Sequence, residues 1–202
     1  MWTGHFLFLK IIGNMVSDPT TGLNPSYAAQ IVVVRLEAFT YLPASAYAAA
    51  CATMIGQALG ASQPKRAIRS GHEGAMQCCM LTAISGTLFV IFAREICGLM
   101  HKEPTVIDIA TPVLVLAGIA QPILALGMVY AGALRGAGDT LYPLIYTACG
   151  LGLMRLPFGY LFGLTMGWGL FGAWIAVAGD MVIRMVLVAI RFRRGKWATL
   201  QV

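Results

Sequence analysis

The sequence predicts an all-α fold, a polytopic bundle of membrane-spanning helices, on three observations. Hydrophobic residues make up 58% of the chain, and the mean hydropathy is +0.77. Only 11% of the residues are charged, against roughly 25% in soluble domains. The apolar residues also run in stretches of more than about 20 residues, the length that a helix needs to cross a bilayer. A soluble domain of this size has too little interior to bury so much apolar surface.

The N-terminal residues 1–16 contain an apolar run that Lys10 interrupts. The run is shorter than the ~20 residues of a full span, and it lacks the basic start and the small-residue cleavage site of a signal peptide. We interpret residues 1–16 as the truncated end of a transmembrane helix. The turn-rich stretch SDPTTGLNPS, residues 17–26, is predicted to be an extracytoplasmic loop.

Residues 27–194 are predicted to form a five-helix transmembrane bundle. Five apolar segments are each long enough to cross about 30 Å of hydrocarbon as a helix. Charged and turn-forming residues separate most of them. We expect the segments at 27–59, 70–94, 107–134, 140–165 and 168–191.

Lysine and arginine residues predict the orientation of the bundle, because the cytoplasmic loops of membrane proteins are enriched in them. If the five segments zigzag, the basic connections all lie on one face, while a loop of mixed charge at 94–108 lies on the other. We therefore expect a multi-pass protein of the cell inner (plasma) membrane with a cytoplasmic tail at 195–202. The basic residues of that face are Lys65, Arg66, Arg69, Arg135, Arg191, Arg193, Arg194 and Lys196.

Other classes of protein fit the sequence poorly. The net charge of +6 does not indicate nucleic-acid binding, because the basic residues lie at the ends of apolar runs rather than along one face with interleaved aromatics. The five cysteines have no C-x-x-C spacing, so neither a metal site nor a disulfide framework is expected. His5, His72 and His101 are scattered without a nucleophile or metal-ligand spacing, so we expect neither an enzyme nor a cofactor.

The stretch GALRGAGDT, residues 132–140, is interpreted as a hairpin between two membrane helices. Arg135 closes the first helix, where exposed carbonyl groups favour a cation. Either Gly136 or Gly138 is expected to supply the left-handed residue that ends this helix, and Asp139 to cap the next one. Glycines are expected to close a helix in the same way in GQALGASQPKRA, residues 56–67. A phosphate-binding loop would need a preceding strand and a Gly-Lys-Ser/Thr ending, which GALRGAGDT lacks.

Several stretches, in their order and spacing, resemble the C-terminal lobe of the MATE (multidrug and toxic compound extrusion) transporters. They are GQALGASQPKRA, LRGAGDTLYP, MRLPFGYLFG, WGLFGAWIA and RFRRGKW, and the resemblance runs from about Phe6 to Trp197. It implies a twelve-helix protein in two lobes, of which this chain carries helices eight to twelve and the end of seven. It also implies secondary active efflux of drugs or other organic, often cationic, compounds in exchange for sodium ions or protons.

The resemblance leaves the coupling-ion site unassigned. One branch of the family uses acids on its seventh and tenth helices, but residues 119–129, on the equivalent of the tenth, contain none. Another branch uses an acid in the N-terminal lobe, which this chain does not include. Because that lobe forms the other wall of the substrate cleft, we expect the chain alone to be inactive.

Charged side chains inside membrane spans are costly and are therefore candidates for the transport pathway. Glu37 and Arg155 lie at equal depth on different predicted helices, so we expect them to form an interhelical pair. Arg35, close to Glu37 in sequence, is a further candidate. Asp180 and Arg184 are four residues apart on one helix, and we expect them to form a separate, structural ion pair toward its cytoplasmic end.

Gln121 and Pro122 are polar and helix-breaking candidates near the middle of the third full helix. Proline frees a backbone carbonyl and kinks a helix, and broken helices at mid-membrane often line transporter sites. A plain kink packed against neighbouring helices is an equally good interpretation of these two residues.

Two alternative functions stay open at this point. One is a lipid-linked saccharide flippase of a related superfamily, which predicts a more cationic central cavity than these few arginines provide. The other is a small membrane scaffold without transport activity. The DNA upstream of Met1 discriminates between a transporter and a standalone protein. An in-frame continuation encoding about seven more helices favours the transporter, whereas a ribosome-binding site at Met1 favours the standalone protein.

Overall fold

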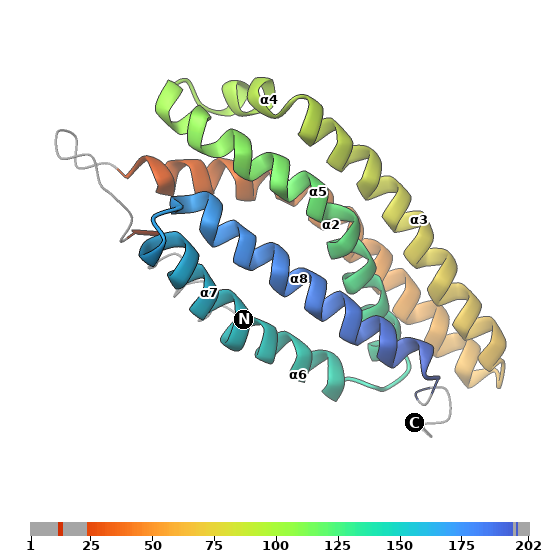
Figure 1. Cartoon of the computed structure of the whole chain (residues 1–202). Helices are drawn as coiled ribbons and strands as arrows, with labels where there is room; N and C mark the ends of the chain where they lie inside the picture. Colours follow the sequence, from red (N-terminus) through yellow and green to blue (C-terminus); the bar gives the residue numbers. More distant parts are fainter. Residues whose placement is uncertain (1–11, 14–23, 196, 198–202) are drawn as a thin grey trace.

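The computed structural model describes residues 12–13, 24–195 and 197, and that part of the chain is almost entirely helical (Figure 1). Most of the predicted half-span at 1–16, of the loop at 17–26 and of the tail at 195–202 lies outside the described residues. Five helical stretches are long and apolar enough to cross a membrane. These stretches confirm the predicted fold class.

The five stretches zigzag between the two ends of the bundle (Figure 1). A short helix, α4, lies between the second and third of them, and the fourth, Leu141–Thr165, alternates between α-helical and π-helical turns. The elements are α2 (Pro25–Gly60), α3 (Pro64–Ile91), α4 (Ala93–Met100), α5 (Pro104–Gly136), α6 (Leu141–Cys149), η1 (Gly150–Arg155), α7 (Leu156–Tyr160), η2 (Leu161–Thr165) and α8 (Gly169–Arg193).

Three of the long helices begin at a proline, which moves their starts ahead of the predicted ones. Pro25, Pro64 and Pro104 each occupy the first turn, where the missing amide proton costs nothing and the fixed φ suits a helix. Asn24 caps α2, because its side-chain oxygen accepts hydrogen bonds from the N–H groups of Ser26 and Tyr27 at 3.0 and 3.3 Å. The start of α3 was predicted six residues too late, so the basic residues assigned to a loop lie on its first turns.

The predicted loop of mixed charge between the second and third spans contains the helix α4. Its charged residues suggested a loop, but Ala93 and Cys97 are buried one turn apart on the side that packs toward α5. The charged residues Arg94 and Glu95 on the same helix are exposed. α4 is therefore amphipathic, and it lies at one end of the bundle (Figure 1).

The left-handed residue that follows the end of α5 is Gly138, one of the two glycines predicted for this position. Gly138 has a φ of +83°, and its N–H bonds the carbonyl of Arg135 at 3.1 Å, while the N–H of Asp139 bonds the carbonyl of Leu134 at 2.9 Å. These two bonds make a Schellman cap. The expectation that Asp139 caps the next helix is wrong, because Thr140 precedes α6 and no side chain caps it.

The turn between α2 and α3 has the same hydrogen bonds, but without glycine in the left-handed position. The N–H groups of Ser62 and Gln63 bond the carbonyls of Leu59 and Ala58 at 2.9 and 2.8 Å. Ser62, with a φ of +58°, is the left-handed residue. A glycine does close this helix, since Gly60 is its last residue, but the expectation of a glycine in the left-handed position is wrong, because Ser62 occupies it.

Helix α5 lies at the centre and packs against α2, α3 and α8. Small residues bring it close to α2, because a Cβ on Gly132 or Gly136 would collide with the backbone of Ala48 or Ala52. The two helices thus meet through residues spaced four apart, the pattern that allows close packing in membranes. This close contact lies in the last turns of α5.

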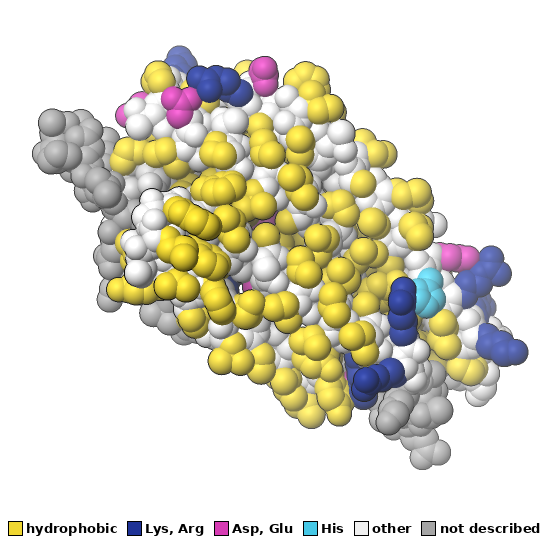
Figure 2. Space-filling view, in the orientation of Figure 1, with side chains coloured by type: hydrophobic (Ala, Val, Ile, Leu, Met, Phe, Trp, Pro, Cys, Tyr) yellow, Lys and Arg dark blue, Asp and Glu magenta, His cyan; other side chains and the backbone are white. Residues whose placement is uncertain are grey.

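The two ends of the bundle carry different charge. Of the described residues, the basic end has seven Lys and Arg against two acids, and the opposite, mixed end has two against three. Figure 2 shows the Lys and Arg gathered at the lower right and both signs at the upper left, with a hydrophobic surface between them. The basic end contains Lys65, Arg66, Arg69, Glu73, Arg135, Asp139, Arg191, Arg193 and Arg194, and the mixed end Arg94, Glu95, Lys102, Glu103 and Asp108.

Candidate functional site inside the helix bundle

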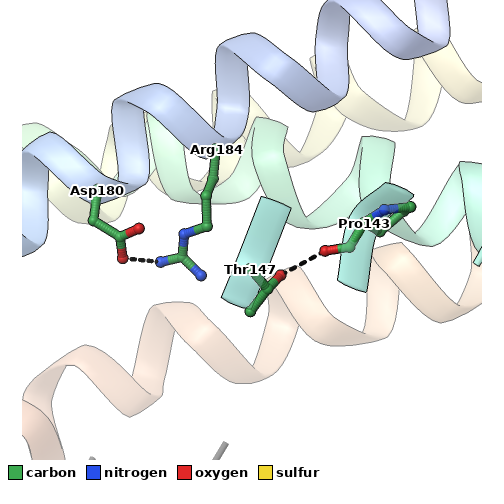
Figure 3. Close-up of polar contacts among 4 residues, drawn as sticks. All are labelled: Pro143, Thr147, Asp180 and Arg184. Atoms are coloured by element: carbon green, nitrogen blue, oxygen red, sulfur yellow. Dashed lines mark hydrogen bonds and ion pairs between the residues drawn. The ribbon is translucent and has the colours of Figure 1, made fainter. Parts of the chain in front are cut away.

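Asp180 and Arg184 form an ion pair in the middle of α8. Arg184 Nη2 lies 2.6 Å from Asp180 Oδ2, and the Asp180 side chain is 0% exposed. Figure 3 shows the guanidinium of Arg184 extending from α8 toward the carboxylate of Asp180. Asp180 is the twelfth of the 25 residues of α8, so the pair lies closer to the middle of the span than the sequence analysis expected.

Gly150 provides the space into which this pair packs. A Cβ at Gly150 would collide with Asp180 Oδ1 and lie 3.0 Å from two carbon atoms of the Arg184 side chain. Gly150 opens η1, whose wider π-helical turns precede Pro157. Proline offers no N–H to the carbonyl four residues earlier, and π-turns of this kind are frequent at functional sites. The fourth span thus packs closely against α8 at the ion pair.

Arg155, the last residue of η1, joins the pair to Glu37 of α2. Arg155 interacts electrostatically with Glu37, Asp180 and Arg184, and Glu37 is itself partly buried. Arg155 is thus within electrostatic range both of Glu37 and of the Asp180–Arg184 pair, which the sequence analysis treated separately. A direct pair between Glu37 and Arg155 stays a prediction. We refer to Glu37, Arg155, Asp180 and Arg184 as the central charged cluster.

The central charged cluster is formally neutral, with two carboxylates and two guanidinium groups. Among the described residues, Asp180 Oδ1 and Arg184 Nε are buried and have no hydrogen-bond partner. A buried polar atom without a partner costs about 1 to 3 kcal/mol, so the cluster has capacity for further contacts. Such a cluster can exchange partners or accept a cation or an anion.

The structure does not bring Arg35 into this cluster. Arg35 is exposed on α2, and Glu37 is partly buried, because residues two apart on a helix point in nearly opposite directions. Arg35 therefore lies on the outer surface of this helix bundle.

Gln121 and Pro122 also lie outside the cluster, near the middle of α5. Gln121 is 1% exposed, and its Oε1 has no hydrogen-bond partner among the described residues. A Cβ on Gly86 of α3 would lie 3.6 Å from the Gln121 Cβ and would collide with the carbonyl oxygen of Gly118. Gln121 is thus held at the tight α3–α5 contact, while Pro122 is partly buried next to it.

Two further polar contacts connect α8 to other elements, and the sequence analysis missed both. The Trp174 Nε1–H donates to Gln30 Oε1 of α2 at 2.6 Å, inside the bundle. Near the basic end, Arg191 Nε donates to Asp139 Oδ2 at 2.8 Å and its guanidinium stacks over the Tyr142 ring at 3.8 Å. Gln30 could have been identified as a candidate from the sequence, because it is a polar residue within an apolar run.

Comparisons with known proteins place these observations in a family context. The family model described as MatE matches residues 24–161. A probable multidrug resistance protein NorM from Thermotoga maritima is 27% identical over 172 residues, which cover 85% of this chain and 37% of that protein. The uncharacterized transporter YisQ from Bacillus subtilis is 28% identical over 144 residues, which cover 71% of this chain and 32% of that protein. The chain thus spans only about a third of the length of these curated relatives.

Solved structures share the fold. The crystal structure of the eukaryotic MATE transporter AtDTX14 superimposes with a TM-score of 0.81 at 20% identity, over 98% of this chain and 43% of that one. The crystal structure of a MATE in the straight conformation gives a TM-score of 0.83 at 18% identity, over 97% of this chain and 43% of that one. At these identities the likeness shows the fold alone.

Proposed function

Because this chain belongs to the MatE family, we propose that it forms part of a secondary active efflux antiporter. Such a protein exports drugs or other organic, often cationic, compounds in exchange for sodium ions or protons. The chain corresponds in this proposal to the C-terminal lobe, and a partner lobe supplies the other wall of the substrate cleft. Its basic end faces the cytoplasm of a bacterial-type inner membrane, in keeping with the positive-inside rule.

The central charged cluster is the observation that carries this proposal. Ionisable groups inside membrane spans are expensive and mark ion and substrate pathways. Among the described residues, Glu37 and Asp180 are the carboxylates in the central parts of the spans. A proton or cation at either one weakens its hold on a guanidinium, so Arg155 and Arg184 redistribute between the remaining partners.

This redistribution links ion binding to helix packing. Arg155 lies on η1, Arg184 on α8 and Glu37 on α2, so a change of partner alters the contact between the fourth span and its neighbours. A ligand shifts a conformational equilibrium only through such differential interactions with the two states. The cluster thus provides a means to couple ion binding to the choice of the open side.

The first test is the DNA upstream of Met1, followed by an efflux assay. We expect an in-frame continuation that encodes about seven more helices. Cells that express the continuous product should export ethidium, and an ionophore that dissipates the coupling gradient should stop the export. A sodium-selective and a proton-selective ionophore distinguish the two coupling ions.

The same assay separates the alternatives. A ribosome-binding site at Met1 without any continuation would contradict the proposal and favour a standalone scaffold. A continuous product that moves lipid-linked saccharide but not ethidium would favour a flippase. Ethidium efflux by the 202 residues alone would contradict the proposed need for a partner lobe.

A further inference from the structure

A small cavity opens between α2 and α3 at the basic end, separate from the central charged cluster. Its volume is about 130 Å³, which accommodates a phosphate group but no complete lipid. It is lined by Met54, Gln57 and Ala58 of α2 and by Arg66 and Ser70 of α3. Nothing in the proposed transport function uses this cavity.

The lining divides into a polar and an apolar part. Ser70 and Ala58 are buried and lie deep in the cavity, while Arg66 and Gln57 are exposed near its rim. Met54, 49% exposed, lies one turn of α2 from Ala58, toward the middle of the membrane span. Met54 and Ser70 are each six residues from the end of their helix at the α2–α3 turn. The inner part of the cavity is therefore apolar on the α2 side and polar on the α3 side.

Arg66 retains most of its hydrogen-bonding capacity for a ligand. The guanidinium offers five N–H donors, and its contact with Gln63 Oε1, at 3.4 Å, is long. Arg66 is also in the first turn of α3, where no side chain caps the helix and Pro64 occupies the start. Unpaired N–H groups and the helix dipole favour an anion at this position, in addition to the charge of the cavity's own arginine.

The surroundings favour an anionic lipid over a soluble anion. Lys65 and Arg69 flank Arg66 on the same turns, and positive charge at this end attracts the anionic lipids of a cytoplasmic leaflet. Basic pockets between transmembrane helices on that side suit phospholipid headgroups. A soluble phosphate would leave the apolar wall at Met54 without a partner, whereas an acyl chain would cover it.

We propose that this cavity binds the phosphate of an anionic phospholipid, such as phosphatidylglycerol. The Arg66 guanidinium, the Gln57 amide and the Ser70 hydroxyl donate hydrogen bonds to the phosphate oxygens. The acyl chains leave the cavity past Met54 and lie against the outer surface of α2 and α3. The bound lipid bridges the two helices just inside their connecting turn.

The test measures lipid retained by the purified chain. The chain is extracted in detergent, washed, supplied with phosphatidylglycerol or phosphatidylcholine, and examined by native mass spectrometry. We expect one tightly held phosphatidylglycerol and no equivalent phosphatidylcholine. Arg66→Gln should weaken the retention about tenfold, the effect of losing a charge-assisted hydrogen bond.

Lys65→Gln is the matched control. It removes the same charge from the same helical turn, but Lys65 does not line the cavity, so retention should change less than twofold. Gln57→Leu is a second cavity variant with an unchanged net charge, and it should also weaken retention. Size-exclusion chromatography of each variant checks that it remains folded.

Three outcomes would overturn the proposal. Equal losses in Arg66→Gln and Lys65→Gln would show that diffuse charge, rather than the cavity, holds the lipid. Equal retention of phosphatidylcholine would show that the anionic charge is not recognised. Full displacement of the lipid by millimolar inorganic phosphate, with phosphate held equally well in its absence, would assign the cavity to a free anion.

Discussion

Asp139, in the turn between α5 and α6, accepts a hydrogen bond from Arg191 in the last turns of α8, with Nε 2.8 Å from Oδ2. The two side chains are 4% and 15% exposed, and Arg191 also stacks over Tyr142. The pair therefore ties the α5–α6 connection to the C-terminal helix. Its members are 52 residues apart.

Replacement of Asp139 should destabilise the chain, because Arg191 would keep its charge in a largely buried place without its acid. We expect Asp139→Asn to lower the free energy of unfolding by about 1 to 3 kcal/mol. Glu73→Gln is the control, since Glu73 pairs with Arg69 at 2.6 Å on the exposed surface, where ion pairs contribute little. Thermal unfolding in detergent checks both variants. Equal midpoints for the two would contradict this role of Asp139.

The close contact between α2 and α5 predicts that alanine substitutions at two glycines, each the last residue of a helix, differ in their effect on stability. Gly136 is the last residue of α5, and its Cβ would collide with the backbone of Ala52, whereas Gly60, the last residue of α2, has nothing within 4 Å. Gly136→Ala should cost about 1 to 3 kcal/mol through overpacking. Gly60→Ala should be close to neutral. The same unfolding assay applies, and a larger loss for Gly60→Ala would refute the close approach.

The fold was largely predictable because the length and polarity of membrane spans are constrained by the bilayer. The five segments follow from the apolar runs, while the orientation expected from the basic residues at their ends stays a prediction. The start of α3 could also have been predicted from the sequence, since a proline such as Pro64 is typical of a first helical turn. The error came from treating the basic residues after it as a loop.

The side-chain partners across helices were less predictable. Asp180 and Arg184 could be paired because they share one helix face at a spacing of four. Whether Arg155 meets them depends on the rotation of the fourth span, which the π-helical turns of η1 change. Periodicity of apolar residues does not report such turns, so the joining of the two pairs became visible only in three dimensions.

Gly150 is predicted to be essential for the packing of the central charged cluster. Gly150→Ala places a methyl group against Asp180 Oδ1 and the stem of Arg184, so it must displace the ion pair or the fourth span. We expect a loss of about 1 to 3 kcal/mol in stability. Gly152→Ala, two residues further in η1, meets nothing within 4 Å and serves as the control. A stable Gly150→Ala variant would show that the pair does not pack as described.

Charge reversal within the central charged cluster distinguishes paired from independent charges. Arg155→Glu places a third acid next to Glu37 and Asp180 and leaves Arg184 as the only base of the cluster. Breaking a buried pair in this way costs about 3 to 5 kcal/mol, so this variant should be the least stable. Arg35→Glu on the exposed side of α2 is the control, and it should retain most of the stability.

The double reversal of Glu37 and Arg155 should recover part of the loss. Glu37→Arg combined with Arg155→Glu restores the attraction between the two positions and the neutrality of the cluster. Recovery stays incomplete, because the new acid at 155 lies next to Asp180, whereas the native arginine there is attracted to it. Folded yield after detergent extraction should therefore rank the native chain first, the double reversal second and Arg155→Glu last. A double reversal no better than Arg155→Glu would show that Glu37 and Arg155 act independently, and the coupling proposed through their exchange of partners would fail with it.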